Sequence, residues 1–156
     1  MKVIIAIDDS PYSAQVVQEL TKRQWLPDVQ FKVLQVIEPA IWEALKTKDG
    51  GEARSSRELA AQRLCAQVRQ SLEASIPTAT VHCEIRKGDA RVEIIDAAGD
   101  WSADKLILGA HGKELCSHSL LGSVSRAVTA HAPCTVEIVR PQALAQAMRE
   151  TGCSRK

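Results

Sequence analysis

The chain has 156 residues, of which 45% are hydrophobic and 25% are charged. That length suits one domain, because a chain of this size buries roughly two thirds of its unfolded surface around a single core. Twenty Lys and Arg residues oppose nineteen Asp and Glu residues, so the formal net charge is +1. Nucleic-acid-binding domains are usually far more basic, and we therefore expect no nucleic-acid partner.

The N-terminal segment carries neither a secretion signal nor a membrane span, because Asp8 and Asp9 interrupt its first apolar run too early for either. We therefore expect a cytoplasmic protein with no membrane association. The cysteines form an odd set without a C-x-x-C pair, which favours reduced thiols over a zinc site or a disulfide framework. They are Cys65, Cys83, Cys116, Cys134 and Cys153.

The first strand and helix are predicted from a short N-terminal pattern. Residues 3–7 form a continuous apolar run, typical of a strand that is buried on both faces. Ser10 suits the N-cap of a helix, and Pro11 suits its first position. The inward face of this helix is expected to carry Ala14, Val17 and Leu20.

Two more elements follow in the same order. Residues 31–37 predict a second strand, and residues 38–51 a long connection containing proline and glycine. Residues 52–75 predict a helix, because small or apolar residues recur every four positions before Pro77 ends the pattern. The expected inward residues are Ala60, Leu64, Val68 and Leu72.

The second half of the chain continues the alternation. Residues 80–86 alternate polar and apolar side chains, which indicates an edge strand with one face in water. A helix ending near Gly99 follows, and residues 105–108 form a short apolar strand that leads into Gly109. The last pair is a helix over residues 122–131 and a strand over residues 134–139.

This alternation predicts βαβ units with right-handed crossovers. We expect a doubly wound α/β fold whose five-stranded parallel sheet has the order 3-2-1-4-5, with helices on both faces. The domain would span residues 1–140, and residues 141–156 would form a C-terminal tail. Ligands bind such sheets beyond the carboxyl ends of the strands, where the strand order reverses. The loops after strands one and four are therefore the candidate site.

The loop after strand four has the spacing G-x2-G-x9-G-[ST], formed by Gly109, Gly112, Gly122 and Ser123. Glycines let backbone amides approach a ligand closely, and a helix that begins near Gly122 offers unpaired N–H groups and a partial positive charge. These features suit a triphosphate. The alternative is that the glycines shape a tight turn and cap the helix without binding anything.

Five segments together resemble the universal stress protein family, in its ATP-binding branch. They are residues 3–10, residues 87–91, the glycine loop, residues 120–125 and residues 131–134. The resemblance covers roughly residues 1–140 by the order of the elements. It implies an ATP-binding protein with a role in stress response or signalling.

The resemblance also assigns residues to the adenosine end of the nucleotide. Asp8 would lie beside the adenosine and accept hydrogen bonds from it, with Ala6 and Ile7 along the same wall. Val36, near the end of strand two, would offer backbone hydrogen bonds to the adenine ring.

The phosphate end and the assembly follow from the same resemblance. Gly109 and Gly112 would contact ribose and phosphates, and His111 between them is expected to donate a hydrogen bond to a phosphate. Mg²⁺ would be held through the phosphates rather than by protein ligands. Two copies would dimerise through their last strands, Thr135 to Val139. The amides and hydroxyls expected to hold the phosphates belong to Gly122, Ser123, Val124 and Ser125.

Three alternatives use the same residues. A metal site at His111, Cys116 and His118 lacks a fourth ligand. A receiver domain would use the acidic pair at residues 8–9 and be phosphorylated on Asp89, but it would leave the glycine loop without a role. An adenylyltransferase or a related nucleotide enzyme would carry a different loop after strand one. No catalytic constellation can be defended, so ATP hydrolysis is expected to be slow at most.

A second class of function is a dimeric scaffold of the same fold that has lost nucleotide binding. Its supporting feature is the composition of residues 114–118, which places Glu114 near the expected triphosphate. Negative charge in that position weakens anion binding.

Overall fold

The computed structural model describes residues 1–38, 50–112 and 120–140. Most of the predicted connection over residues 38–51 and the whole predicted tail over residues 141–156 lie outside these ranges. The described helices are too short or too polar to serve as membrane spans.

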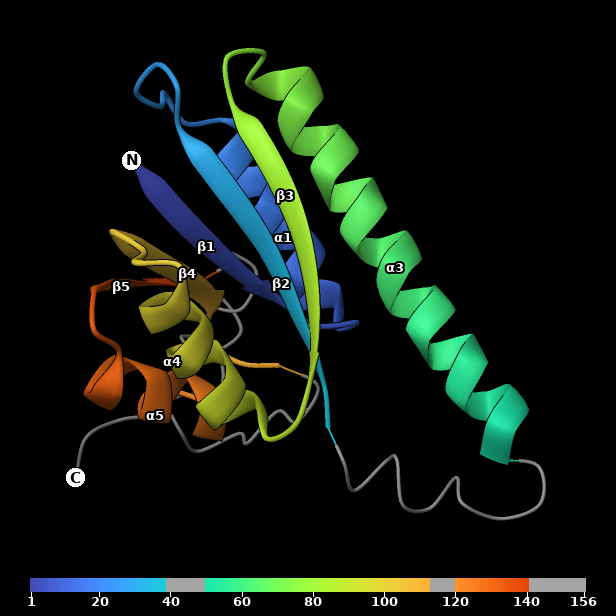
Figure 1. Ribbon diagram of the computed structural model, residues 1–156. Coiled ribbons are helices and arrows are strands. Elements are labelled where there is room, and N and C mark those ends of the chain that lie inside the picture. The colour runs from blue at the N-terminus through green and yellow to red at the C-terminus, as the bar shows by residue number, and fades with distance from the viewer. Residues whose placement is uncertain (39–49, 113–119, 141–156) are drawn as a thin grey trace, which may run out of the picture.

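Five parallel strands form one sheet in the order β3-β2-β1-β4-β5 (Figure 1). This order and the α/β class confirm the prediction from sequence. β1 and β4 lie at the centre, with Ala6 opposite Leu108 in their register. The strands are β1 Lys2–Ile7, β2 Gln30–Ile37, β3 Thr80–Lys87, β4 Lys105–Gly109 and β5 Thr135–Val139.

Helices cover both faces of the sheet, as expected. α1 and α3 pack on one face, and α4 and α5 on the other (Figure 1). α1 has Ser10 as its N-cap and proline at its first turn, as the sequence predicts. The helices are α1 Pro11–Thr21, α3 Gly50–Ser75, α4 Ala90–Asp100 and α5 Ser123–His131.

The strand alternation divides the core into two layers. Val3 and Ile5 of β1 contact the layer under α1 and α3, whereas Ile4 contacts the layer under α4 and α5. All three side chains are fully buried. Because both faces of β1 are covered, the strand needs apolar residues at consecutive positions. This explains the continuous run in the sequence.

The predicted inward faces of α1 and α3 contain one error each. Ala14 and Ala60 are exposed, not inward. An alanine is tolerated on the buried face and on the exposed face of a helix at little cost. The spacing of small residues therefore does not determine which face of the helix is buried. Val68 and Leu72 are buried as predicted and Leu64 is partly buried against the core, whereas Ala61 and Cys65 are buried in addition.

β5 is tied to its neighbours by one carboxylate. Glu137 of β5 pairs with Arg23, just beyond α1, and its Oε2 lies 3.2 Å from Nζ of Lys105 in β4. Partial burial alone would raise the pKa of Glu137, but hydrogen bonds from Arg23 and Lys105, together with their charges, lower it overall. The charged form of Glu137 is therefore favoured in the folded protein.

Glu137→Gln tests this contribution through its pH dependence. The pKa of Glu137 in the folded protein lies below its ordinary value of 4.5. The charged carboxylate therefore stabilises the fold at pH values above 4.5, and this stabilisation is lost as the pH falls through the pKa of the folded protein. We expect the variant to lose about 1 kcal/mol of unfolding free energy near neutral pH, and the difference from wild type to shrink on acidification. Urea unfolding at a series of pH values measures it.

Glu19→Gln is the matched control. Glu19 pairs with Lys22, and both side chains are well exposed, so its removal has little effect at any pH. A loss in Glu137→Gln that stays constant from neutral to acidic pH would show that the charge of Glu137 is not its source.

Candidate functional site

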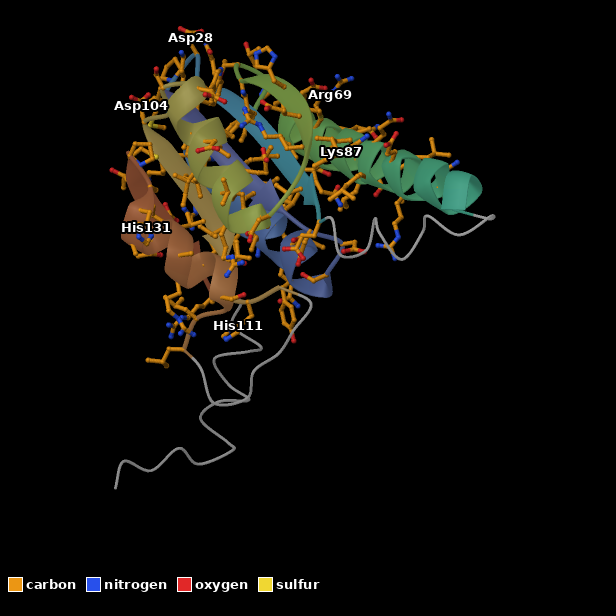
Figure 2. The ribbon with its side chains drawn as sticks, turned by 60° about the horizontal axis from the view of Figure 1, so that its bottom comes forward. Asp28, Arg69, Lys87, Asp104, His111 and His131 are labelled. Carbon is orange, nitrogen blue, oxygen red and sulfur yellow. The ribbon has the colours of Figure 1, made fainter. Side chains whose placement is uncertain are left out.

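The candidate site lies where the loops after β1 and β4 meet, at the carboxyl ends of the central strands. Because β1 and β4 are parallel neighbours, their following loops leave the same edge of the sheet. α1 then begins on one face of the sheet and α5 on the other. Figure 2 shows His111 at this end and Asp28 and Asp104 at the opposite end. This is the point of strand reversal at which doubly wound folds bind ligands.

Asp8 is held rigidly at the start of this crevice. Its Oδ1 accepts hydrogen bonds from the Ser10 amide at 3.2 Å, the Ser10 hydroxyl at 2.5 Å and the Ser13 hydroxyl at 2.6 Å. The Asp8 amide in turn donates to Ser13 Oγ at 2.9 Å. Ser10 and Ser13 are both buried, so this network fixes the carboxylate against the first turn of α1.

The second carboxylate oxygen of Asp8 faces the glycine loop. A methyl group built on Gly112 would lie 2.6 Å from Oδ2, closer than a carbon and an oxygen can approach without movement. Among the described residues, none donates a hydrogen bond to Oδ2. One oxygen therefore anchors the loop after β1, and the other stands at the meeting of the two loops, able to accept a hydrogen bond.

Gly109 is also required for close packing. A Cβ there would lie 3.2 Å from the carbonyl oxygen of His111 and 3.5 Å from Cγ2 of Val16 in α1. The first of these contacts is with backbone, which cannot rotate away as a side chain can. A side chain at residue 109 would therefore fit tightly, and the backbone at His111 would have to shift by a few tenths of an ångström.

Ala110 fastens the loop to its surroundings through both backbone groups. Its amide donates to the Val139 carbonyl at 3.1 Å, and its carbonyl accepts from the Gly122 amide at 2.8 Å. The Gly122 amide is therefore already paired within the protein. At Gly122 itself a Cβ would make ordinary contacts of 3.5 Å or more, so the glycine is not forced there by packing.

Ser125 also serves the structure of the loop. It is 4% exposed, and its hydroxyl is directed to the carbonyls of Gly109 at 2.8 Å and Ala110 at 3.1 Å. This hydroxyl has one proton to donate, and both acceptors are backbone groups of the protein. The phosphate contact expected of Ser125 is thereby limited to its amide.

The N-terminus of α5 has no side-chain cap for its first-turn amides. Gly122 is the N-cap and offers no side chain to accept from them. The first backbone hydrogen bond of the helix joins the Arg126 amide to the Gly122 carbonyl. The amides of residues 123–125 precede that bond, so they have no partner within the helix. Helix N-termini with unpaired first-turn amides are places where proteins can bind anions.

The adenosine-side residues lie at the ends of β1 and β2. Ala6 packs toward α4 and α5, whereas Ile7 is buried toward α1 and α3, so these neighbours line opposite faces of the sheet. Ile37 accepts a hydrogen bond from Gly88 beside β3. Since alternate residues of a strand direct their backbone groups to opposite sides, those of Val36 point toward β1, whose pairing with β2 ends at Ile7.

His111 is buried, with 6% of its surface exposed. It lies between Gly109 and Gly112, at the same end of the molecule as the crevice (Figure 2). Cys116 and His118, which would join His111 in the alternative metal site, lie outside the described residues, as does Glu114. Within the described ranges no group of three or more metal-binding side chains is found.

Sequence reasoning missed the structural partners of the site. Ser10, Ser13 and Ala110 make hydrogen bonds that hold Asp8 and the glycine loop in place. The spacing D-x-S-x-x-S over residues 8–13 is the signal that could have revealed the serines, because it joins a turn-forming aspartate to an N-cap and the first turn of a helix. Ala110 acts through its backbone and leaves no such signal.

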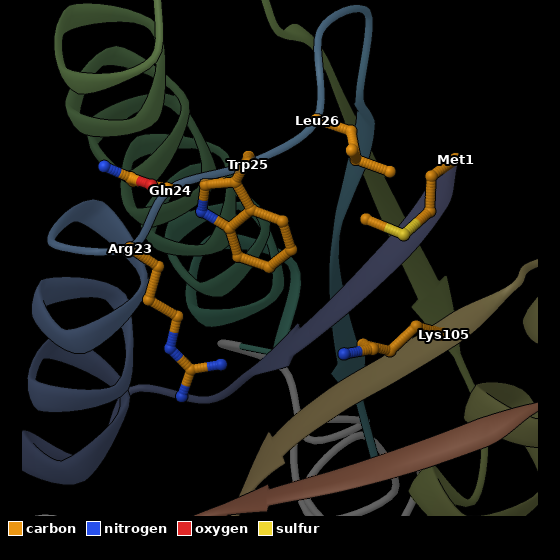
Figure 3. A pocket seen from close by; sticks show the side chains of 6 residues that line it. All are labelled: Met1, Arg23, Gln24, Trp25, Leu26 and Lys105. Carbon is orange, nitrogen blue, oxygen red and sulfur yellow. The ribbon is translucent and has the colours of Figure 1, made fainter.

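A pocket of about 240 Å³ lies elsewhere, at the amino ends of β1 and β4. Figure 3 shows Arg23 and Lys105 extending toward it from the segment after α1 and from β4, with Trp25 behind. Both cations already pair with Glu137. The pocket is also smaller than the roughly 300 Å³ at which ligand sites usually begin, so it is not the candidate site.

The family model for "Universal stress protein family" matches residues 1–140. A universal stress protein of Methanothermobacter thermautotrophicus is 39% identical over 64 residues, which are 41% of this chain and 43% of that relative. A putative universal stress protein of Staphylococcus epidermidis is 23% identical over 140 residues, covering 90% of this chain and 84% of that one.

Solved structures share the fold. A hypothetical protein whose biochemical function was assigned from its structure superposes with a TM-score of 0.78 at 23% identity, over 89% of this chain and 94% of that one. A universal stress protein in complex with cAMP gives 0.62 at 18%, over 89% and 95%. A family member of Arabidopsis thaliana with AMP bound gives 0.62 at 18%, over 90% and 91%. With the family model spanning residues 1–140, the chain belongs to the universal stress protein family.

Proposed function

We propose that this protein binds ATP in the crevice between the loops after β1 and β4. The observation that carries the proposal is the position of Asp8, whose Oδ1 is fixed by Ser10 and Ser13 while its Oδ2 faces Gly112. A carboxylate oxygen held in this way suits a hydroxyl or amine of a nucleoside. The first-turn amides of α5 suit the phosphates.

The choice of an adenine nucleotide rests on two supports. Structural relatives of the same family were solved with cAMP and with AMP, and both ligands contain adenosine and phosphate. The second support is the glycine spacing from Gly109 to Ser123, which resembles that of the ATP-binding branch. We propose that Val36 contacts the adenine through its backbone, with Ala6 and Ile7 near the adenosine.

The phosphate end of the proposed site needs more positive charge than the protein supplies, and we propose that Mg²⁺ provides it. The N-terminus of α5 contributes about half a positive charge, but Asp8 and Asp9 lie in the loop across the crevice. A triphosphate there needs a counter-ion, which Mg²⁺ supplies when it is bound through the phosphate oxygens. The residues that would hold the phosphates are Gly109, His111, Gly112 and the amides of residues 123–125. We propose binding rather than turnover as the function of this site.

Gly112→Ala tests the site. The added methyl group would collide with Oδ2 of Asp8, and the network around Oδ1 prevents the carboxylate from yielding easily. We expect the dissociation constant for Mg-ATP to rise about tenfold or more, equivalent to about 1.4 kcal/mol. Isothermal titration calorimetry of the wild type and the variant, with and without Mg²⁺, measures the change.

Gly99→Ala is the matched control, because a Cβ at Gly99 in α4 would meet nothing within 4 Å. It should bind ATP as the wild type does and be slightly more stable, by roughly 0.5 to 1 kcal/mol. If wild-type protein gives no binding heat at millimolar nucleotide, the dimeric scaffold is the better description. If Gly112→Ala binds normally, ATP binds somewhere else.

We also propose a homodimer formed through β5. β5 ends the sheet beside β4, and Val136 and Ile138 are only partly buried there. Thr135 and Val139 bond toward β4 and its flanking segments, so the alternate residues direct their backbone groups to the open edge. A second β5 would extend the sheet across two chains and cover an edge that otherwise invites aggregation.

Val136→Pro tests the dimer. Proline removes the N–H of residue 136 from the open edge and leaves the hydrogen bonds toward β4 in place. We expect the variant to be monomeric at concentrations at which the wild type is a dimer, as measured by size-exclusion chromatography with light scattering. Val136→Thr keeps the N–H and the branched shape, so it should remain dimeric. A Val136→Pro dimer as stable as the wild type would exclude pairing through this edge.

The role that we propose for the occupied state is in stress response or signalling. It rests on membership of the universal stress protein family and on the glycine loop, which ATP would order between Gly109 and Ser123. Proteins that recognise the ordered loop would then distinguish the occupied form from the empty one.

A further inference from the structure

Two cysteines outside the nucleotide site lie against each other. Cys65 is on α3 and Cys83 on β3, where the helix packs along the edge strand (Figure 1). The Cys83 thiol donates to the Cys65 carbonyl at 3.4 Å, and each thiol affects the pKa of the other. Both are free thiols. The Cys83 sulfur therefore lies against the residue that carries the second thiol, so side-chain rotation can bring the two sulfur atoms toward each other.

The two thiols differ in access to solvent. Cys65 is buried, with 1% of its surface exposed, whereas Cys83 is exposed. An oxidant dissolved in water therefore reaches Cys83 first, and Cys65 stands behind it as the second thiol. An accessible cysteine beside a second thiol has two of the features of thiols that oxidise reversibly.

We propose that Cys65 and Cys83 are a site of reversible oxidation, at which a peroxide converts the two thiols to a disulfide. The Cys83 thiolate attacks hydrogen peroxide, the O–O bond breaks, and a sulfenic acid and hydroxide form. The Cys65 sulfur then attacks the Cys83 sulfur, so that the S–S bond forms and the S–O bond breaks. The sulfenic oxygen leaves as water with the Cys65 proton. Two thiols and one peroxide give one disulfide and two waters.

The surroundings set the order and the pH dependence of these steps. Burial raises the pKa of Cys65 to about 12, with further increases from the charge and hydrogen bond of Cys83. Burial also raises the pKa of Cys83, while Arg69 lowers it and Glu73 raises it, both from α3. Because the reactive form is the thiolate, the reaction is slow at neutral pH and becomes faster as the pH rises.

The bridge would fasten the long helix α3 to the edge of the sheet. β3 is joined to the sheet by β2 alone, and α3 contacts both of these strands. The two cysteines are 18 positions apart, and closing a loop of that length stabilises a fold mainly by restricting its unfolded chain. The oxidised protein should unfold at a temperature roughly 5 to 10 °C higher than the reduced protein.

The experiment uses the full chain and reads the bond directly. The protein is treated with hydrogen peroxide, the remaining thiols are blocked with N-ethylmaleimide, and trypsin digestion without reductant is followed by mass spectrometry. Cleavage after Arg63, Arg69 and Arg86 puts Cys65 in residues 64–69 and Cys83 in residues 70–86. We expect these two peptides joined, 2 Da lighter than their sum, and separated by dithiothreitol.

Two variants separate this bond from general oxidation. Cys83→Ser, at an exposed position, should abolish both the joined peptide and the rise in unfolding temperature. Cys134→Ser removes a different thiol and should leave both unchanged. The proposal is overturned if Cys65 and Cys83 remain open to N-ethylmaleimide after oxidation once the protein is unfolded. It is also overturned if Cys83 is found as a sulfinic acid, or joined to any cysteine other than Cys65.

Discussion

The parallel pairing of β1 with β4 is the constraint on which the rest of the site depends. Val3 to Ala6 pair with Lys105 to Leu108, and the central side chains of both strands are fully buried. Since the strands run in the same direction, the loops that follow them emerge side by side, although they are about a hundred residues apart in sequence. This brings the Asp8 carboxylate against Gly112, and the N-cap of α5, Gly122, lies beside Ala110 and His111 of the same loop.

Within the site, the same groups serve the fold and the proposed ligand. Asp8 uses one oxygen to hold the first turn of α1 and presents the other to the glycine loop. The Ser125 hydroxyl and the Gly122 amide are both paired with backbone carbonyls of the loop. These bonds hold the two described ends of the loop, at Gly109–Ala110 and at Gly122–Ser125, in place. The first-turn amides of residues 123–125 are the ones that we propose to bind the phosphates.

The thiol pair lies on the far side of the sheet from β4 and β5, between α3 and the edge strand β3. Its chemistry depends on the contact of a buried and an exposed sulfur, and not on any residue of the nucleotide crevice. The two proposed properties are therefore separable in one small domain. Nucleotide binding would take place at the carboxyl ends of the central strands, and thiol oxidation at the edge strand β3.

The sequence by itself determined the order of strands and helices, because buried parallel strands require continuous apolar runs and helices require their own spacing. It also revealed the glycine loop, since Gly109 and Gly112 stand where a side chain would collide. Only the tertiary structure decided which face α3 buries, because Ala60 and Ala61 look alike until a sheet packs against one of them. The partners of Asp8, the engaged hydroxyl of Ser125 and the contact of Cys65 with Cys83 were likewise decided there. Each of these contacts joins residues that only packing brings together, because the spacing of residues along the sequence does not give their distance in the folded protein.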